Sequence, residues 1–359
     1  MTPIRFEVSS AYGAYAVVIG PGVVREVDVL TRPFGRSRLI VSADPIWRRH
    51  GRHLRSIAGR RGPALVPDGE RAKSLATVAR LYDVFVERSL DRASTIIAFG
   101  GGVLGDLTGF AAATYLRGVA FVQVPTTLVA QVDSAIGGKV GVNLAAGKNL
   151  VGAFYPPRLV VCDPTLLSTL PRREFRAGLY EVVKYGVIAS RPLFDRVSTG
   201  LDLLFRQDAA ALNQVIADCC ALKVATVVQD EREAGPRRIL NFGHTIGHAL
   251  EAVTRYRRLL HGEAVGYGML AAARLSAARG LLGADDEAAL GDLIRRMGPL
   301  PAVGDLSAAR VIDAIGHDKK VVNGTLHFVL ATAIGATSMA TDVTTTEIRR
   351  ALRHIGLRA

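Results

Sequence analysis

Three histidines and a carboxylate occur in a pattern that could bind a metal ion. His244 and His248 lie four residues apart in the segment NFGHTIGHALE, 241–251, whose apolar residues recur with helical spacing. Side chains four residues apart emerge from one face of a helix. His261 follows a short arginine-rich loop, and Glu181 lies on another expected helix. Two histidines, a carboxylate and open positions suit catalytic Zn²⁺, but the sequence does not decide which two histidines bind.

The chemistry at these histidines differs from that of the zinc proteases. In the HExxH motif of those enzymes, a glutamate base directly follows the first histidine. Here that position is Thr245. Lys184 lies three residues after Glu181, on the same face of the expected helix, and places a cation beside the carboxylate. The pattern therefore indicates a metal or proton-transfer site of another kind.

A glycine-rich turn predicts a nucleotide site. Gly100, Gly102 and Gly105 match G-x-G-x-x-G between the strand-like run STIIAF and a helical stretch. Glycines let the backbone approach a pyrophosphate, and a helix N-terminus supplies N–H donors. The next strand-like run, 119–125, ends without the Asp or Glu that holds a ribose in the standard motif. We therefore expect a Rossmann-like but non-standard domain.

A further segment, 125–149, concentrates polar side chains among small residues. Its glycines allow tight backbone turns, so these side chains could converge on a ligand. Its GGK sequence is too short for a phosphate-binding P-loop. The polar residues are Thr126, Thr127, Asp133, Lys139, Asn143, Lys148 and Asn149.

The elements that would position these residues divide the chain in two. Up to about residue 165, short β-branched runs alternate with glycine turns and helical stretches, which predicts βαβ units and a mainly parallel sheet. From about Pro171 the sequence changes to long amphipathic segments rich in alanine and leucine. We predict an α/β dinucleotide-binding domain at 1–170 and a helical metal- and substrate-binding domain at 171–359.

Composition excludes several classes of protein. No apolar run reaches membrane-spanning length and the N-terminus lacks a secretory pattern, so we expect a cytoplasmic protein without a membrane partner. The cysteines Cys162, Cys219 and Cys220 provide no disulfide framework. The net charge of +13 is clearest at 47–62 and 255–258. Trp47 and Tyr256 are the only Phe, Trp or Tyr residues in these two stretches, too few for a single-strand platform, so we interpret the charges as solvated surfaces and predict no nucleic-acid partner.

Several motifs in a fixed order resemble those of the 3-dehydroquinate synthase family. They are FGGGVLGDLTGFAAATYLRG, PTTLVAQVDSAIGGK, EVVKYG, DEREAGPRRILNFGHTIGHALE, LHGEAV and HDKK. The similarity covers nearly the whole chain and is densest from 95 to 265. It implies an α/β NAD-binding domain with an all-α C-terminal domain, NAD⁺ and Zn²⁺ (or Co²⁺) as cofactors, and a homodimer.

The resemblance also implies a reaction, in the shikimate pathway of aromatic amino acid biosynthesis. The sugar phosphate 3-deoxy-D-arabino-heptulosonate 7-phosphate would become 3-dehydroquinate and phosphate. The implied steps are a transient NAD-dependent oxidation, β-elimination of phosphate, reduction and an aldol cyclisation. The cofactor is regenerated, so no net redox change is expected.

The family's functional residues correspond to positions of this chain. The implied metal ligands are Glu181, His244 and His261. The implied catalytic residues are His248, Lys139, Lys184, Asn241 and Arg237. The implied substrate contacts are Asp133, Asn149, Lys223, Lys319, Lys320 and, from the partner subunit of a dimer, Arg117. The implied NAD⁺ contacts are Asp44, Glu70, Lys73, Gly101, Gly102, Asp106, Thr126, Thr127, Asp133, Lys139, Lys148 and Thr169.

Two other activities fit the same architecture. One is another sugar phosphate cyclase with a different substrate. The heptulosonate phosphate is favoured over such a substrate by the GGK at 137–139, Arg237 and Asn241. The other is a metal-dependent polyol or alcohol dehydrogenase. Such an enzyme needs no cations around a phosphate, so Lys139, Lys223 and Arg237 count against it.

Overall fold

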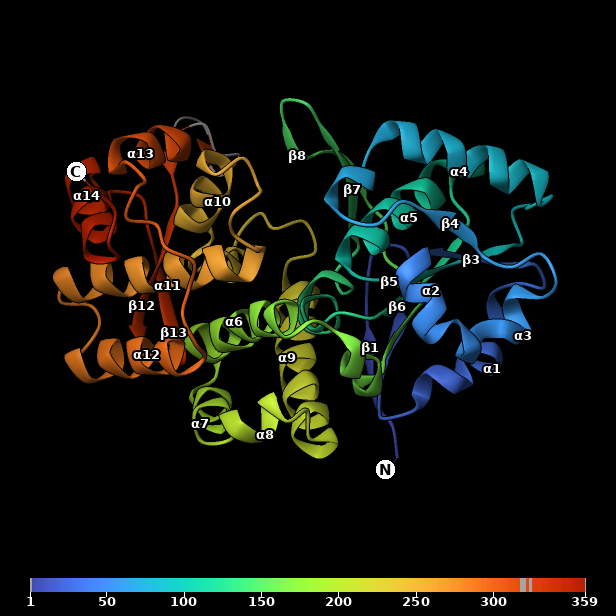
Figure 1. Ribbon diagram of the computed structural model, residues 1–359, viewed down its shortest axis with the longest axis horizontal. Coiled ribbons are helices and arrows are strands. Elements are labelled where there is room, and N and C mark those ends of the chain that lie inside the picture. The colour runs from blue at the N-terminus through green and yellow to red at the C-terminus, as the bar shows by residue number, and fades with distance from the viewer. Residues whose placement is uncertain (1, 317–320, 323–324, 359) are drawn as a thin grey trace. The chain divides into compact units, whose positions relative to one another are not determined.

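The computed structural model describes residues 2–316, 321–322 and 325–358, which form two compact units (Figure 1). One unit comprises Met1–Pro171 and Gln207–Arg232, and the other comprises Arg172–Arg206 and Glu233–Ala359. The segment Met1–Pro171 ends beside the domain boundary that the sequence predicts between residues 170 and 171. Residues 207–232, which the sequence pattern assigns to the helical domain, belong to the first unit. A helical pattern shows that a face is apolar, but it does not show which core that face joins.

The first unit is built on a seven-stranded sheet of order β1-β2-β9-β6-β5-β3-β4. The strands are β1 (Ile4–Val8), β2 (Tyr15–Ile19), β3 (Arg38–Ala43), β4 (Ala64–Val66), β5 (Thr95–Gly100), β6 (Ala120–Pro125) and β9 (Leu159–Cys162). Neighbouring strands are parallel except β1 and β2. Every residue of β5 and β9 is buried, as expected for a parallel sheet covered on both faces. The predicted parallel α/β unit is confirmed.

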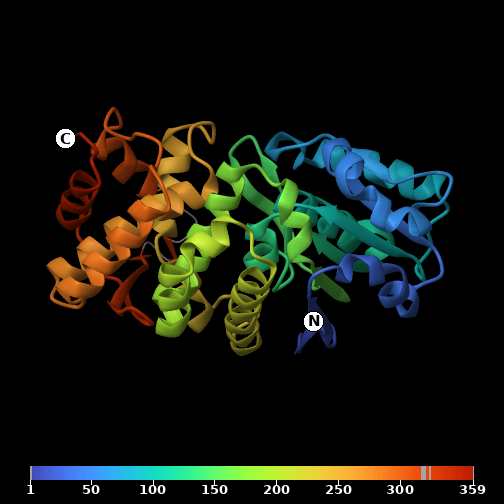
Figure 2. The same ribbon diagram turned by 60° about the horizontal axis from the view of Figure 1, so that its bottom comes forward.

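Helices cover both faces of this sheet (Figure 2). Alternate residues of β5 show the two faces, because Ile96 joins one apolar cluster and Ile97 the other. The first cluster includes α4 (Leu75–Glu87) and α5 (Gly102–Thr114), and the second includes α1 (Val27–Thr31). The short helices α2 (Asp44–His50) and α3 (Arg55–Ala58) complete this part, and a separate hairpin pairs β7 (Lys139–Leu144) with β8 (Gly147–Phe154).

Helix α9 (Ala209–Gln229) completes the first unit. It is long and apolar enough to cross a membrane by length and composition alone, but 56% of its apolar window is buried inside the protein. It packs against β1, β2 and a short π-helix, η6 (Ala130–Ser134). These contacts are those of a core helix.

The second unit is mainly helical. Its helices are α6 (Arg172–Ala189), α7 (Arg191–Thr199), α8 (Leu201–Phe205), α10 (His244–Val253), α11 (His261–Ala278), α12 (Ala284–Arg296), α13 (Ala308–Gly316) and α14 (Thr345–His354). The all-α expectation needs a correction, because two hairpins are also present: β10 (Val321–Val322) with β11 (Thr325–Leu326), and β12 (Phe328–Ala333) with β13 (Ala336–Ala340). Strand β12 is a short apolar run that closes the core of α10, α11, α13 and α14. Periodicity alone does not distinguish such a run from a buried helical segment.

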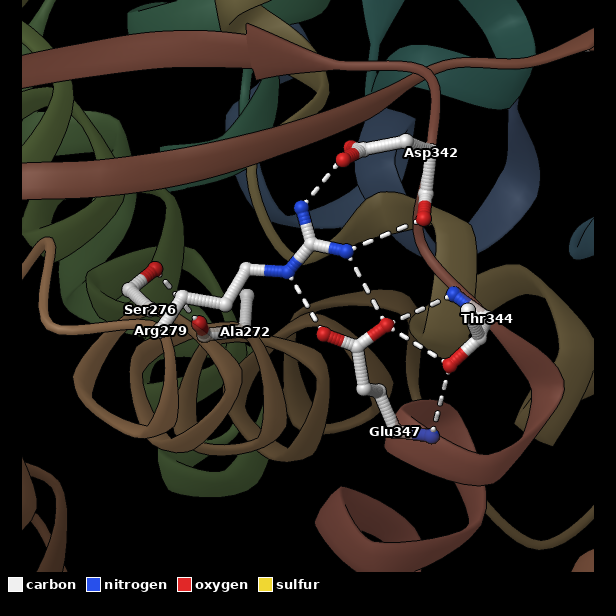
Figure 3. A network of polar contacts seen from close by, with 6 residues as sticks. All are labelled: Ala272, Ser276, Arg279, Asp342, Thr344 and Glu347. Carbon is white, nitrogen blue, oxygen red and sulfur yellow. Dashed lines mark hydrogen bonds and ion pairs between the residues drawn. The ribbon is translucent and has the colours of Figure 1, made fainter.

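Arg279 joins the end of α11 to the start of α14 (Figure 3). Its guanidinium donates two hydrogen bonds to the Glu347 carboxylate, at 2.7 and 2.9 Å, and one to the Asp342 carboxylate at 2.8 Å. Glu347 also accepts a hydrogen bond from the Thr344 N–H, and the Thr344 hydroxyl accepts one from the Glu347 N–H. This capping box fixes the first turn of α14. One ion pair therefore ties two helices of the second unit together.

Replacing Arg279 by methionine should destabilise the second unit by about 2 kcal/mol, because a bidentate charge-assisted pair is lost. Hydrogen bonds from Arg279 hold the pKa of Glu347 at about 2, below its ordinary value of 4.5. A lowered carboxyl pKa gives stability that is present above the unfolded value and is lost as the pH falls towards the folded value. The difference in Tm between the wild type and Arg279→Met should therefore shrink as the pH falls from about 5 to about 2.

The matched control for this experiment is Arg274→Met. Arg274 makes an exposed 3.5 Å pair with Glu287, so its loss should change the Tm little at any pH. A Tm difference for Arg279→Met that stays constant over the same pH range would contradict this account of Glu347.

Candidate active site

Close packing of three helices brings the candidate metal residues together. Gly262 lies in the first turn of α11, where a Cβ atom would stand only 1.8 Å from the carbonyl oxygen of Ala177 in α6. Gly268 makes the same kind of contact, since a Cβ there would lie 1.8 Å from the carbonyl oxygen of Gly243, which precedes α10. Only glycine permits such backbone approaches. The HGE and FGH motifs therefore set the distances between α6, α10 and α11.

These helices place four predicted residues in one cluster. Glu181 comes from α6, His244 and His248 from α10, and His261 is the first residue of α11. The ligand atoms of the three histidines lie within 4.8 Å of one another. Glu181 Oε1 lies 3.6 Å from His244 Nε2 and 3.3 Å from His261 Nε2, and Lys184 Nζ lies 2.7 Å from Glu181 Oε2. The arrangement is a set of metal-type donors with a cation at its edge.

Glu181 is a fully buried anion. Burial raises the pKa of its carboxyl, but the cation of Lys184 and the neighbouring His244 outweigh burial and hold the pKa well below its usual range. Its Oε2 lies 2.7 Å from the Lys184 ammonium and its Oε1 lies 3.3 Å from His261 Nε2, so cationic groups surround the carboxylate. A buried carboxylate is stable only with such partners, and a metal ion could take the place of the proton on His261.

The tautomers of two histidines follow from their neighbours. His244 Nδ1 lies 3.1 Å from the carbonyl oxygen of Phe242, which can only accept, so this nitrogen carries the proton. His261 Nδ1 lies 3.1 Å from Oε2 of Glu251, a carboxylate that is 4% exposed. Burial lowers the pKa of His261, but the carboxylates of Glu181 and Glu251 outweigh burial and raise the pKa to about 10, so a metal ion would displace the Nε2 proton that faces Glu181. Glu251 is not among the residues predicted from the sequence, although it lies three residues after His248 on the same helix.

Glu263 fixes the start of α11 and so the position of His261. Its buried carboxylate accepts a hydrogen bond from the Leu260 N–H at 2.9 Å and two from the Arg173 guanidinium, both at 2.7 Å. The pKa of Arg173 is raised by these bonds. The glutamate of the HGE motif is therefore a capping residue, and it ties α11 to the first turn of α6.

Arg237 and Asn241 lie in one short segment before α10, the 3₁₀ helix η8 (Pro236–Asn241). Arg237 is 2% exposed, and Asn241 donates a hydrogen bond of 2.5 Å to Glu233. Gly243 then adopts a left-handed conformation, φ 75°, and begins α10. Glu233 is not among the predicted site residues, although it belongs to the quoted DEREAG stretch.

The glycine motif forms the predicted strand–turn–helix in the first unit. Strand β5 ends at Gly100, and Gly101 is the N-cap of α5, with no side chain capping the first turn. A Cβ at Gly101 would lie 3.0 Å from the Thr127 side chain, and one at Gly105 only 2.4 Å from Gln123 on β6. The motif therefore leaves backbone N–H groups of the first turn uncapped by side chains and packs α5 tightly on the sheet.

Polar residues gather beside this turn. The Lys73 ammonium, 4% exposed, forms an ion pair with Asp106 on α5 and donates a hydrogen bond to Asn149 on β8. Burial raises the pKa of Asp106, and Lys73 opposes that rise. Asn143 on β7 donates to Glu70 at 2.7 Å. The Asn149 N–H donates to Asn143 Oδ1 at 2.9 Å, so five predicted residues, distant in the sequence, are linked in one network.

A separate ion pair joins Asp133, on the π-helix η6, to Lys223 on α9, with 2.6 Å between Asp133 Oδ1 and Lys223 Nζ. The Thr126 N–H donates to the Gly100 carbonyl oxygen, so the threonines after β6 lie beside the glycine turn. Lys139 begins β7 and Lys148 lies on β8. The predicted residues of segment 125–149 therefore sit on η6, the end of β6 and the hairpin.

Five predicted residues do not belong to these groups. Arg117 is exposed at the end of the 3₁₀ helix η5 (Tyr115–Arg117). Asp44 forms an exposed ion pair with Arg48 on α2, and Thr169 lies 2.6 Å from His50 Nε2. Lys319 and Lys320 lie outside the described residues.

Solved structures define the class of protein. The chain is 29% identical to a 2-epi-5-epi-valiolone synthase from Streptomyces hygroscopicus subsp. jinggangensis 5008 with NAD⁺ and Zn²⁺ bound (TM-score 0.87; 95% of this chain and 96% of that one). It is 28% identical to a 2-deoxy-scyllo-inosose synthase complexed with carbaglucose-6-phosphate, NAD⁺ and Co²⁺ (TM-score 0.86; 98% and 100%). The chain shares its fold with a probable glycerol dehydrogenase from Sinorhizobium meliloti 1021. The two are 16% identical, with a TM-score of 0.63 over 95% of this chain and 96% of that one. The class is that of the sugar phosphate cyclases.

Sequence relatives then define the family. The family model described as 3-dehydroquinate synthase N-terminal matches residues 63–177. The family model described as 3-dehydroquinate synthase C-terminal matches residues 178–321. A 3-dehydroquinate synthase of Pelotomaculum thermopropionicum is 46% identical over 90% of this chain and 89% of its own length, and one of Thermosynechococcus vestitus is 45% identical over 95% and 96%. The chain belongs to the 3-dehydroquinate synthase family. The predicted enzyme class and function are confirmed, and the predicted fold class is confirmed apart from the two hairpins of the second unit.

Proposed function

We propose that this chain converts 3-deoxy-D-arabino-heptulosonate 7-phosphate to 3-dehydroquinate and phosphate, with NAD⁺ and a divalent metal bound. Its identity of 41–46% to proteins named for that activity supports the substrate. The observation that carries the proposal is the buried Glu181 carboxylate facing the Nε2 atoms of His244 and His261. We also propose a cytoplasmic location and a homodimer.

The donor set fits Zn²⁺ or Co²⁺. A carboxylate oxygen and two neutral imidazole nitrogens are borderline donors that suit these ions, and they leave positions open. We propose Glu181, His244 and His261 as the ligands, because the Nδ1 atoms of both histidines are engaged and Nε2 of each faces Glu181. When bound, the metal lowers the pKa of a substrate hydroxyl while NAD⁺ takes up and returns a hydride.

The glycine turn of the first unit fits a dinucleotide. A side chain at Gly101 or Gly102 would meet Thr127 or Ser134, and the N-terminus of α5 offers N–H groups to a pyrophosphate. The Lys73–Asp106 pair gives this region fixed charges. We propose that NAD⁺ contacts Asp44, Glu70, Lys73, Gly101, Gly102, Asp106, Thr126, Thr127, Asp133, Lys139, Lys148 and Thr169.

The chain's own residues would bind the substrate and move its protons. We propose that Lys184, which is 1% exposed, and Arg237 hold anionic groups of the substrate, since fixed cations in a site that excludes water bind carboxylate and phosphate strongly. His248 lies beside the two proposed histidine ligands and would handle a proton, and Asn241 would orient the substrate. The other proposed groups are Lys139 in catalysis and Arg117, Asp133, Asn149, Lys223, Lys319 and Lys320 in substrate binding.

A comparison of substrates tests the activity. We expect the protein, supplied with NAD⁺ and Zn²⁺, to release phosphate from the heptulosonate phosphate and to leave glucose 6-phosphate and glycerol unchanged. Faster turnover of glucose 6-phosphate would favour another cyclase, and oxidation of glycerol would favour a dehydrogenase. Light scattering tests the homodimer separately, since a monomer mass at assay concentration would contradict it.

A further inference from the structure

Glu251 is a buried carboxylate that contacts one of the proposed metal ligands. It lies in the last turn of α10, the helix that also carries His244 and His248, and it is 4% exposed. Its Oε2 lies 3.1 Å from Nδ1 of His261. A carboxylate that accepts the Nδ1 proton leaves the Nε2 lone pair of the same ring available to a metal.

The turn between α10 and α11 brings Glu251, at the end of α10, next to His261, at the start of α11. After Glu251, the N–H of Tyr256 donates to the Glu251 carbonyl oxygen at 2.8 Å, and Arg255 and Tyr256 adopt left-handed φ values of 53° and 55°. This tight turn brings the chain back so that His261 begins α11 beside the last turn of α10. Arg258 anchors the loop through two hydrogen bonds to Asp305, at 2.6 and 2.8 Å.

The two proposed histidine ligands are held in different ways. The carbonyl oxygen of Phe242, a neutral acceptor fixed by the backbone, accepts the Nδ1 proton of His244. His261, whose side chain is 37% exposed, is oriented by an anion on a side chain instead. A carboxylate also makes the imidazole a stronger electron donor to a metal than a neutral acceptor does. A point substitution of Glu251 can therefore remove the hydrogen-bond partner of His261, whereas the backbone partner of His244 cannot be removed in this way.

We propose that Glu251 is a positioning residue of this enzyme, which fixes the tautomer and ring orientation of His261 and so raises the affinity for the divalent metal. The proposal rests on the proposed function, because it takes Glu181, His244 and His261 as the ligands. It adds a residue that acts through His261 and does not itself touch the metal.

The test measures metal binding without any turnover. Zn²⁺ affinity is obtained by competition with a chromogenic chelator, and the ligand field by the visible spectrum of the Co²⁺ form. We expect Glu251→Gln to bind Zn²⁺ about 10-fold more weakly and Glu251→Ala up to about 100-fold more weakly, with a shifted Co²⁺ spectrum. Glu287→Gln, which changes an acid to an amide at a pair with Arg274, is the control and should match the wild type.

Three outcomes decide the matter. Weakened binding and a shifted spectrum, with metal-free Tm values close to the wild type, would support the positioning role. Wild-type affinity and an unchanged Co²⁺ spectrum in Glu251→Gln would overturn it and leave the proposed function intact. A wild-type protein that binds neither ion would instead overturn the metal part of the proposed function, and with it this inference.

Discussion

Gly262→Ala is expected to abolish metal binding and to reduce activity at least about 100-fold. The new Cβ would lie 1.8 Å from the carbonyl oxygen of Ala177, and both atoms belong to helices that cannot yield locally. Helices α6 and α11 must then separate. Ala177 lies one turn before Glu181, and Gly262 follows His261 directly, so the separation acts on the 3.3 Å approach of these two proposed ligands.

The measurement is Zn²⁺ affinity together with the Tm, which should fall by an amount that corresponds to about 3 kcal/mol. Gly283→Ala is the matched control, because a Cβ at Gly283 has no atom within 4 Å and its φ of −66° suits alanine. Gly262→Ala protein that binds Zn²⁺ like the wild type would show that the glycine does not set the spacing of the site.

Glu181→Gln should lower kcat by about 1000-fold, because it removes the only anionic donor among the three proposed ligands. It should also destabilise the metal-free protein by about 3 kcal/mol, since Lys184, buried to 1% exposure, loses the carboxylate 2.7 Å from its Nζ. The measurements are steady-state kinetics and the free energy of unfolding from denaturant titration.

A double variant separates the two effects of this substitution. In Glu181→Gln with Lys184→Met the buried cation is absent, so much of the lost stability should return while the metal remains weakly bound. If the single variant retained kcat within about 10-fold of the wild type, Glu181 could not be a ligand of an essential metal.

The strand–turn–helix of the nucleotide motif could be predicted because it depends on local sequence. Strand β5, the N-cap Gly101 and helix α5 follow one another, and each is fixed by propensity and by glycine geometry. The histidine cluster could be predicted in part for the same reason, because His244 and His248 share one helix. The residues alone left the choice among the three histidines open, and the ligand set of Glu181, His244 and His261 came from the family resemblance and stays a prediction.

Other features depend on contacts that no local pattern reveals. Helix α9 has the composition of the helical domain but packs with the sheet of the first unit. Asp133 lies on a π-helical turn, η6. The sequence of segment 125–149 predicts a group of polar side chains but does not predict this turn. The arginine-rich loop at 255–258, interpreted as solvated, contains Arg258 in a bidentate pair with Asp305, so part of that charge has a structural role.

The central claim is a reaction that uses NAD⁺ without net oxidation, and one assay tests it most directly. Phosphate release and absorbance of NADH are followed together while the protein, with catalytic NAD⁺ and Zn²⁺, consumes the heptulosonate phosphate. We predict phosphate in amounts equal to the 3-dehydroquinate formed, no accumulation of NADH, and loss of both products on chelation of the metal or in His244→Ala. NADH that accumulates in proportion to the substrate consumed, without phosphate, would contradict the account and identify a dehydrogenase.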